Sequence, residues 1–181
     1  MATRAAIPFS VRRATTADAA TVAALGARLF TESYGPTHPE PELSRYLART
    51  FPEDAMREAI GSDDVTMLLA EDADGAAIGY SFMRDSPAPP EGVSGERVIE
   101  IVRFYVDGAA QGRGVGAALM AQSIADAREQ GADTLWRQAW KEAPWAVGFY
   151  QRMGFAVVGS TLFHFGEQQT GEDHVMAFTI A

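Results

Sequence analysis

The sequence contains no cysteine, and this absence removes several chemistries at once. Disulfide bonds, thiolate-bound metal sites and a cysteine nucleophile are all excluded. A composition without cysteine fits a reducing compartment, so we expect a cytoplasmic location. Long apolar runs are absent too, because no stretch approaches the ~20 apolar residues of a membrane helix. Residues 1–8 lack the apolar run of a signal peptide, and we expect them to form a flexible tail.

Positive charge is also scarce. The chain has 15 Lys and Arg against 24 Asp and Glu, which gives a formal net charge of −9. A field of this sign repels polyanions and attracts cations, so we expect no nucleic-acid partner, although acidity also serves solubility. The three histidines show no metal-ligand spacing, and we expect no metal site. They are His38, His164 and His174.

The remaining composition is that of an ordinary globular protein, with 47% hydrophobic and 22% charged residues. A chain of this length can bury a sizeable core, and we expect one domain over residues 9–181. Periodicity and turn residues predict strands at 9–13, 65–71, 77–83, 97–106, 133–140, 155–159 and 175–180. They predict helices from 15 to about 30, two within 40–60, one over 113–130 and one over 144–153. This order favours an α/β (α+β type) fold with a mixed, mostly antiparallel sheet of six to seven strands and about four helices.

A glycine-rich loop joins the predicted strand 97–106 to the helix that follows it. Its alternating glycines, Gly112, Gly114 and Gly116, allow positive φ and a close approach of the backbone to a ligand. Successive N–H groups at a helix start suit a pyrophosphate, although glycine turns of this kind also occur for packing. A P-loop fits less well, since no Lys-Ser/Thr follows. A Rossmann start fits less well because the spacing differs from G-x-G-x-x-G and the loop lies late in the chain.

Two segments resemble motifs of the GNAT superfamily of N-acetyltransferases. Gln111-Gly112-Arg113-Gly114-Val115-Gly116 is similar to the acetyl-CoA motif Q/R-x-x-G-x-G/A. Phe149-Tyr150-Gln151-Arg152-Met153-Gly154-Phe155 is similar to the segment F-Y-x-x-x-G-F. Both fall at the expected places in the order of elements, so the likeness covers most of the chain. It implies a GNAT fold, acetyl-CoA as cosubstrate and acyltransferase activity (EC 2.3.1 class).

The resemblance also implies which residues contact the cofactor. Ala143 stands where many members have asparagine, seven residues before the tyrosine, so that contact is absent or replaced by Lys141. The implied contact residues are Phe104, Tyr105, Val106, Gln111, Gly112, Arg113, Gly114, Val115, Gly116, Ala117, Lys141, Ala143 and Phe149.

Other segments resemble bacterial polyamine (spermidine/spermine-type) N-acetyltransferases. They are residues 100–106, 140–142, 159–166 and 173–176. The acceptor implied is a primary amine, either a polyamine or a similar small cationic amine. Three alternatives stay open: an antibiotic acceptor, a protein lysine or N-terminus, and a non-catalytic acyl-CoA sensor. A homodimer is among the states that the resemblance allows.

Acetyl transfer to an amine needs a polarised carbonyl, a neutral amine and a proton for the departing thiolate. The resemblance places Tyr150 near the cofactor sulfur, which makes it the candidate acid; the alternative is a core aromatic residue. Glu100 is the candidate base, directly or through water, or a ligand of the amine. It lies four residues before Phe104 on a predicted strand, and an even spacing shares a face. Arg103 is out of phase with Phe104 and should face the other way.

The acceptor should be bound by the region at the end of the first helix. Phe30, Glu32 and Tyr34 combine aromatic and acidic groups that suit an ammonium, although a solvated loop has the same composition. The three tryptophans are expected to be core or interface residues rather than ligand contacts.

Overall fold

The computed structural model describes residues 6–165 and 168–180. Its helices are α1 (Ala19–Tyr34), α2 (Glu42–Thr50), α3 (Glu53–Ile60), α4 (Val115–Glu129) and α5 (Pro144–Arg152), with 3₁₀ turns at Thr16–Asp18 and Gly35–Thr37. Its strands are β1 (Phe9–Arg13), β2 (Val65–Asp72), β3 (Ala77–Asp85), β4 (Val98–Val106), β5 (Thr134–Trp140), β6 (Ala156–Phe165) and β7 (Gln168–Thr179).

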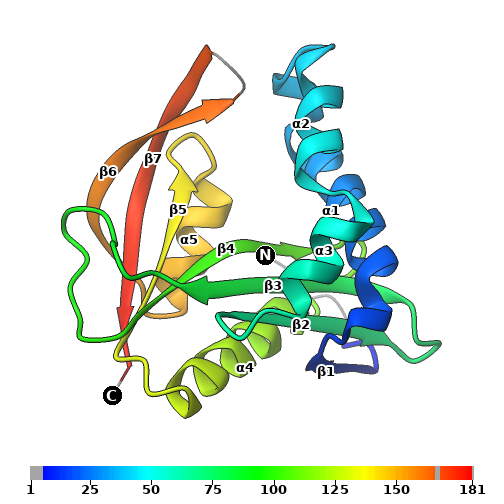
Figure 1. Ribbon diagram of the computed structural model, residues 1–181, viewed down its shortest axis with the longest axis horizontal. Helices are drawn as coiled ribbons and strands as arrows, with labels where there is room; N and C mark the ends of the chain where they lie inside the picture. The colour runs from blue at the N-terminus through cyan, green and yellow to red at the C-terminus, as the bar shows by residue number, and fades with distance from the viewer. Residues whose placement is uncertain (1–5, 166–167, 181) are drawn as a thin grey trace. The chain divides into compact units, whose positions relative to one another are not determined.

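The seven strands form one mixed sheet in the order β1-β2-β3-β4-β5-β7-β6 (Figure 1). This confirms the predicted fold class. The chain divides into two compact units that share β3, β4 and α4. The first unit holds residues up to Phe82 together with Arg103–Gln122, and the second holds Met83–Val102 together with residues from Ser123 onward.

In the first unit, α1 buries one stripe of small and branched side chains, which includes Val22, Leu25 and Leu29. Helix α1 packs against α3, and β1 pairs antiparallel with β2. The guanidinium of Arg12 bonds Asp18 in the 3₁₀ turn and Glu71 on β2, so it fastens the start of the helical segment to the sheet. These bonds hold the pKa of Asp18 well below its usual range.

The second unit is built around β5. This strand pairs parallel with β4 over Val98–Glu100 and antiparallel with β7 over its full length. The ladder between β4 and β5 ends at the pair Glu100 and Trp136, although β5 continues to Trp140. The two strands therefore part immediately after Glu100.

The largest differences from the predicted boundaries concern α1, β6 and β7. Helix α1 continues to Tyr34, beyond the predicted end near Phe30, and the Phe30 and Tyr34 rings lie 4.8 Å apart between centroids, one turn apart on that helix. Strands β6 and β7 are both longer than predicted because they pair with each other along the hairpin that joins them.

Within the described residues, no helix combines the length and the apolar character needed to cross a bilayer.

Candidate active site

The glycine loop of the first unit has positive φ at two of its three alternating glycines, whereas Gly116 lies within α4 and has no positive φ. Gly112 and Gly114 have φ of 73° and 93°, values that side-chain-bearing residues rarely adopt. A Cβ on Gly114 would meet nothing within 4 Å, so glycine is needed there for conformation rather than for space. Helix α4 starts directly afterwards, with the Ala118 N–H donating to the Gly114 carbonyl at 3.0 Å.

This start of α4 fits a pyrophosphate group. The N–H groups of Val115, Gly116 and Ala117 belong to the first turn, where no helical carbonyl lies four residues back. Val115 is fully buried and packs with Ala70 and Ala110, so the turn is anchored in the core of its unit. A fixed row of N–H groups with the positive end of a helix dipole is the arrangement that binds phosphate oxygens.

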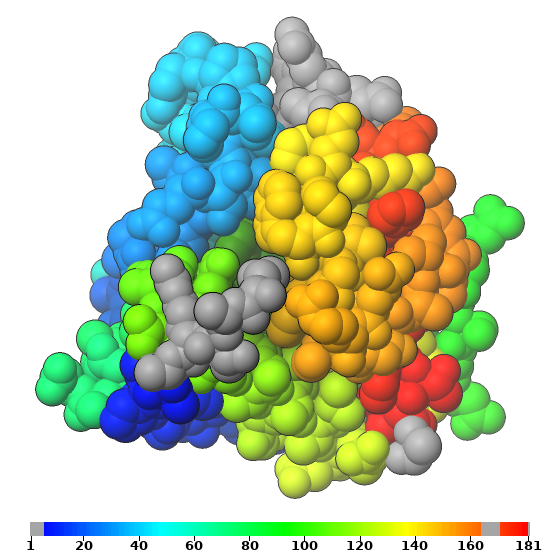
Figure 2. All heavy atoms as spheres, turned by 180° about the vertical axis from the view of Figure 1, so that it is seen from behind, coloured from blue at the N-terminus to red at the C-terminus, as the bar shows by residue number. Residues whose placement is uncertain are grey.

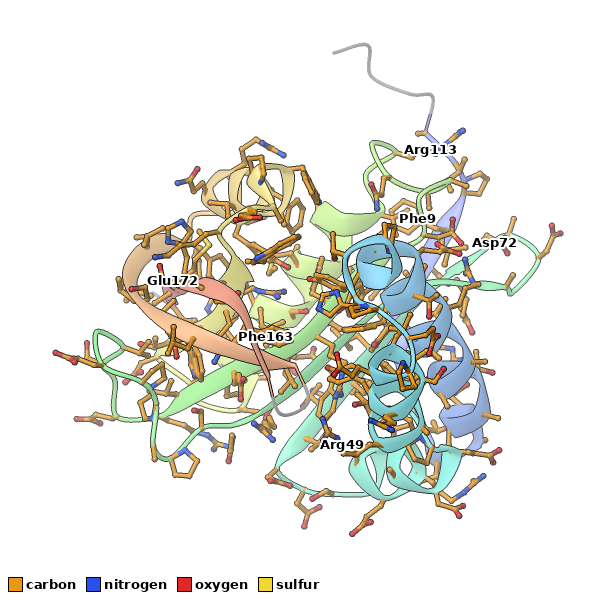
Figure 3. All side chains as sticks on the ribbon, turned by 90° about the horizontal axis from the view of Figure 1, so that it is seen from above. Phe9, Arg49, Asp72, Arg113, Phe163 and Glu172 are labelled. Atoms are coloured by element: carbon orange, nitrogen blue, oxygen red, sulfur yellow. The ribbon has the colours of Figure 1, made fainter. Side chains whose placement is uncertain are left out.

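Two polar side chains of the loop, those of Gln111 and Arg113, hydrogen-bond to the main chain of the same segment. Gln111 donates through Nε2 to the Val106 carbonyl at 2.9 Å, and Arg113, labelled in Figure 3, donates through Nε to the Ala109 carbonyl at 2.9 Å. Of the predicted contact residues in this loop, Gln111 and Arg113 therefore shape the main chain that would hold a phosphate.

Sequence reasoning missed Asp107 and Arg28. The Asp107 carboxylate accepts the Ala109 N–H at 2.9 Å and forms an ion pair with Arg28 of α1 at 2.8 Å. Both the Ala109 N–H and the Arg28 guanidinium lower the pKa of Asp107, and its partial burial opposes them. An aspartate two residues before a loop N–H is a recognisable turn signal, whereas nothing in the sequence points to Arg28.

On β4, the structure corrects the predicted facing of Glu100. The Arg103 guanidinium lies over the rings of Phe51 and Phe82, at 5.2 and 5.3 Å, while Arg84 bonds Glu100. Phe82 and Arg84 are two residues apart on β3 and share a face. Glu100 and Arg103 therefore also share a face although their spacing of three positions is odd, which requires an irregularity such as a β-bulge in β4.

The facing of the other β4 residues follows from this irregularity. Tyr105 stacks on Tyr80, with ring centroids 5.8 Å apart, and so it points as Arg103 does. Phe104 lies between them in sequence and points to the opposite face. The prediction that Glu100 shares the face of Phe104 is wrong, because simple alternation does not hold across residues 100–103. The prediction that Arg103 and Phe104 point to opposite faces is confirmed.

Glu100 itself is a largely buried carboxylate at the point where β4 and β5 part. Its side chain is 15% exposed. Arg84 donates to Oε2 through Nε at 3.1 Å and through Nη2 at 2.9 Å. Both bonds end on the same oxygen, so neither is made to Oε1.

Tyr150 lies on α5 in the second unit and is 4% exposed. Its hydroxyl is a hydrogen-bond partner of Arg137 Nη1, and the Arg137 guanidinium carbon lies 4.4 Å from the ring centroid. Phe149 and Phe155 contact the ring edge to face, at 5.2 and 5.8 Å. An arginine can only donate, so it holds the phenol oxygen and does not accept the phenol proton. No motif or spacing in the sequence points to Arg137.

The segment between β5 and α5 explains two further predicted residues. Ala143 is buried at the N-terminal end of α5, where its carbonyl accepts the N–H groups of Ala146 and Val147. The Lys141 ammonium bonds Glu172 of β7 at 2.6 Å (Figure 3 labels Glu172). Lys141, which directly follows β5, thus forms an ion pair with β7. Its contact to the cofactor remains a prediction.

The structure separates the residues predicted to bind the acceptor. All three lie on α1 rather than in a loop. Phe30 is buried and stacks on Tyr46 with a centroid distance of 4.5 Å, while Tyr34 packs beside it. Glu32 is exposed and forms an ion pair with Arg28 one turn earlier. The aromatic pair and the carboxylate therefore do not form one cluster, because Glu32 is two residues out of step with the helical repeat.

Trp136 is buried, as predicted for a core residue, and its indole donates to Ser86 at 3.0 Å. Trp145 is 69% exposed on α5, whose yellow-orange atoms form part of the surface in Figure 2.

Among the described residues, no group of three or more His, Cys, Asp or Glu side chains could hold a metal ion.

Comparison with known proteins identifies the family. The acetyltransferase (GNAT) family profile matches residues 27–155. A mycothiol acetyltransferase of Saccharomonospora viridis is 30% identical over 118 residues, which are 65% of this chain and 38% of that protein. The chain thus spans well under half the length of that relative. An uncharacterized N-acetyltransferase of Mycobacterium tuberculosis is 26% identical over 160 residues, which are 88% of this chain and 96% of that protein.

A solved structure shows the same fold. The PaiA N-acetyltransferase of Thermoplasma acidophilum, determined in complex with coenzyme A, has a TM-score of 0.72 at 14% identity, and the match covers 96% of this chain and 99% of that one. The family profile matches more than half of the chain. The chain therefore belongs to the acetyltransferase (GNAT) family, whose members are acyltransferases that use acetyl-CoA.

Proposed function

We propose that this protein is an acetyl-CoA-dependent N-acetyltransferase that transfers the acetyl group directly to a primary amine. The observation that carries the proposal is the loop before α4, with Gly112 and Gly114 at positive φ and a helix start anchored by buried Val115. This main chain would hold the pyrophosphate of the donor, and the chain's own cysteine-free composition is consistent with direct transfer.

The second unit supplies the candidates for proton transfer. The amine nitrogen attacks the thioester carbonyl carbon, the carbon–sulfur bond breaks, and the thiolate takes a proton. We assign that proton to the Tyr150 hydroxyl, whose oxygen is held by Arg137. The proton lost by the amine goes to Glu100 Oε1, directly or through water, since Arg84 occupies Oε2.

We propose a polyamine or a similar small cationic amine as the acceptor. The net charge of −9 and the resemblance of residues 100–106 and 173–176 to polyamine acetyltransferases support this class. Neither the mycothiol acetyltransferase nor the uncharacterized N-acetyltransferase is named as an enzyme that acts on polyamines. The acceptor therefore has to be identified by assay.

The test measures thiol release from acetyl-CoA with spermidine, spermine, 1,6-diaminohexane, an aminoglycoside and a lysine peptide. Tyr150→Phe should lower kcat about 100-fold with little change in the KM for acetyl-CoA, because it removes the proton donor and keeps the ring. Tyr80→Phe is the matched control, since it removes a buried hydroxyl that has no hydrogen-bond partner among the described residues.

Each outcome assigns the function differently. Turnover of polyamines that falls in Tyr150→Phe and survives in Tyr80→Phe supports both the acceptor class and the acid. Turnover of the lysine peptide alone would replace the polyamine with a protein acceptor. Binding of CoA without thiol release for any amine would contradict the proposal and identify an acyl-CoA sensor.

A further inference from the structure

Asp173 is a buried carboxylate of the second unit that the steps above do not use. It lies on β7 and is 6% exposed, and its Oδ1 is buried with no hydrogen-bond partner among the described residues. Burial raises the pKa of Asp173, while the nearby charges of Arg137 and His174 lower it. A buried carboxylate oxygen without a partner is costly, so its position requires an explanation.

The strand register places an aromatic ring and a hydroxyl beside Asp173. Asp173 lies directly opposite Trp140 on β5 and opposite Thr161 on β6. Directly paired residues of antiparallel strands point to the same face, so all three side chains share one face of the sheet. A Cβ on Gly171 would lie 3.0 Å from the Trp140 indole nitrogen, so the indole lies against the main chain of β7 two residues from Asp173.

Two basic side chains near Asp173, those of Arg137 and Lys141, already contact other residues. Arg137 is three residues from Trp140 on β5, an odd spacing that puts it on the opposite face, where it contacts Tyr150. Lys141 bonds the neighbouring Glu172. Carboxylate, indole and hydroxyl together provide the groups that bind an ammonium: a counter-charge, a π face and an acceptor oxygen.

We propose that Asp173, Trp140 and Thr161 bind an ammonium group of the acceptor other than the one that is acetylated. The inference rests on the proposed function and narrows its acceptor to amines with at least two cationic nitrogens. The bound ammonium supplies the missing partner of Asp173 Oδ1, which a monoamine cannot do while its single nitrogen is reacting.

The test compares 1,6-diaminohexane with hexylamine, which differ in the second ammonium. Asp173→Asn should raise the KM for the diamine about tenfold or more and leave kcat and the KM for hexylamine nearly unchanged. The control Asp74→Asn, in the exposed turn between β2 and β3, should change neither. Trp140→Phe keeps a ring with a weaker π face, and it should raise the KM for the diamine a few-fold.

Stability separates binding from a structural role. Asp173→Asn should keep or raise the Tm, because it removes a buried charge that lacks a partner. A lowered Tm with equal shifts in the KM of both amines would overturn the inference and make Asp173 a structural residue. If Asp173→Asn does not fold, Trp140→Phe decides by the same comparison.

Calorimetric titration separates this inference from the proposed function. With CoA present, 1,6-diaminohexane should bind the unmodified protein at least about tenfold more tightly than hexylamine, and the Asp173 variant should lose that difference. Such binding without turnover would support the ammonium site and contradict small-amine acetylation. Turnover of both amines with equal KM in the unmodified protein would contradict the ammonium site alone.

Discussion

Gly26 in the middle of α1 fills a position where a side chain has no room. A Cβ there would lie 2.6 Å from Phe51 Cε1 and 2.9 Å from the Tyr80 hydroxyl. Both neighbours are buried rings, and Arg103 covers Phe51. Such rings cannot move aside as a flexible surface chain does, so the helix comes close to the aromatic core only through glycine.

Gly26→Ala should therefore lower the free energy of unfolding by about 1–2 kcal/mol, since overpacking outweighs the gain in helix propensity. Urea denaturation of the variant and the unmodified protein measures this difference in unfolding free energy, provided that the two m-values agree. Gly148→Ala in α5 is the matched control, because its Cβ would meet only the end of the Arg152 side chain at 3.3 Å. Equal effects at the two glycines would show that helix propensity alone matters and that the Phe51 contact does not.

The loop before α4 depends on one carboxylate. Asp107→Asn weakens the ion pair with Arg28 and the bond from the Ala109 N–H, so the loop loses part of its fixed shape. We expect the KM for acetyl-CoA to rise a few-fold while kcat changes little, because positioning of the donor is affected and proton transfer is not. Steady-state kinetics on both substrates measure it.

Asp72→Asn is the control for this loop. Asp72 accepts the N–H groups of Asp74 and Ala76 in the turn between β2 and β3, so it is a similar turn carboxylate in another segment. It should alter stability without altering the KM for acetyl-CoA. A rise in that KM of equal size in both variants would mean that the Asp107 effect is general loosening.

The contribution of Asp107 to the free energy of unfolding depends on pH in a defined direction. The pKa of Asp107 is lowered in the folded protein, so its stabilising contribution is fully present above the unfolded value of about 3.9. The contribution is lost as the pH falls through the lower, folded value. Below about pH 4, the difference in unfolding free energy between Asp107→Asn and the unmodified protein should therefore shrink, as acid-range calorimetry can show.

Much of the fold was predictable because local patterns decided it. Strand β1 alternates, and the break at Phe51-Pro52 separates α2 from α3. Gly131 and Gly154 have φ of 78° and 93° just after α4 and α5, as helix-ending glycines require. The bounds of β6 and β7 were predicted poorly, because their outer halves depend on pairing with each other and not on their own sequence.

Residues of the candidate site could be named from the sequence where they belong to a motif. Residues whose surroundings come from strand pairing could not be named in this way. Gly112, Gly114 and Tyr150 lie within recognisable spacings. Arg137 and Asp173 acquire their surroundings from strand pairing, which no local spacing reports. Glu100 was placed on the wrong face relative to Phe104 because one irregularity in β4 reverses all later alternation.

The net charge of −9 acts over the entire protein and makes a prediction about salt. A cationic acceptor is attracted to this field, so kcat/KM for 1,6-diaminohexane should fall a few-fold as ionic strength rises from about 0.02 to 0.2 M. The fall should be shallower for hexylamine, which carries one charge. Assays at fixed, saturating acetyl-CoA measure both slopes, and equal slopes would contradict steering by net charge.

The path of the chain between the two compact units limits how such a protein can be rearranged. The chain passes from one unit to the other three times, after Phe82, Val102 and Gln122, and each passage lies within β3, β4 or α4. No single cut releases either unit with all its own strands and helices. The two units consequently cannot be exchanged between genes as separate cassettes, because each unit is encoded by two segments that alternate with those of the other unit.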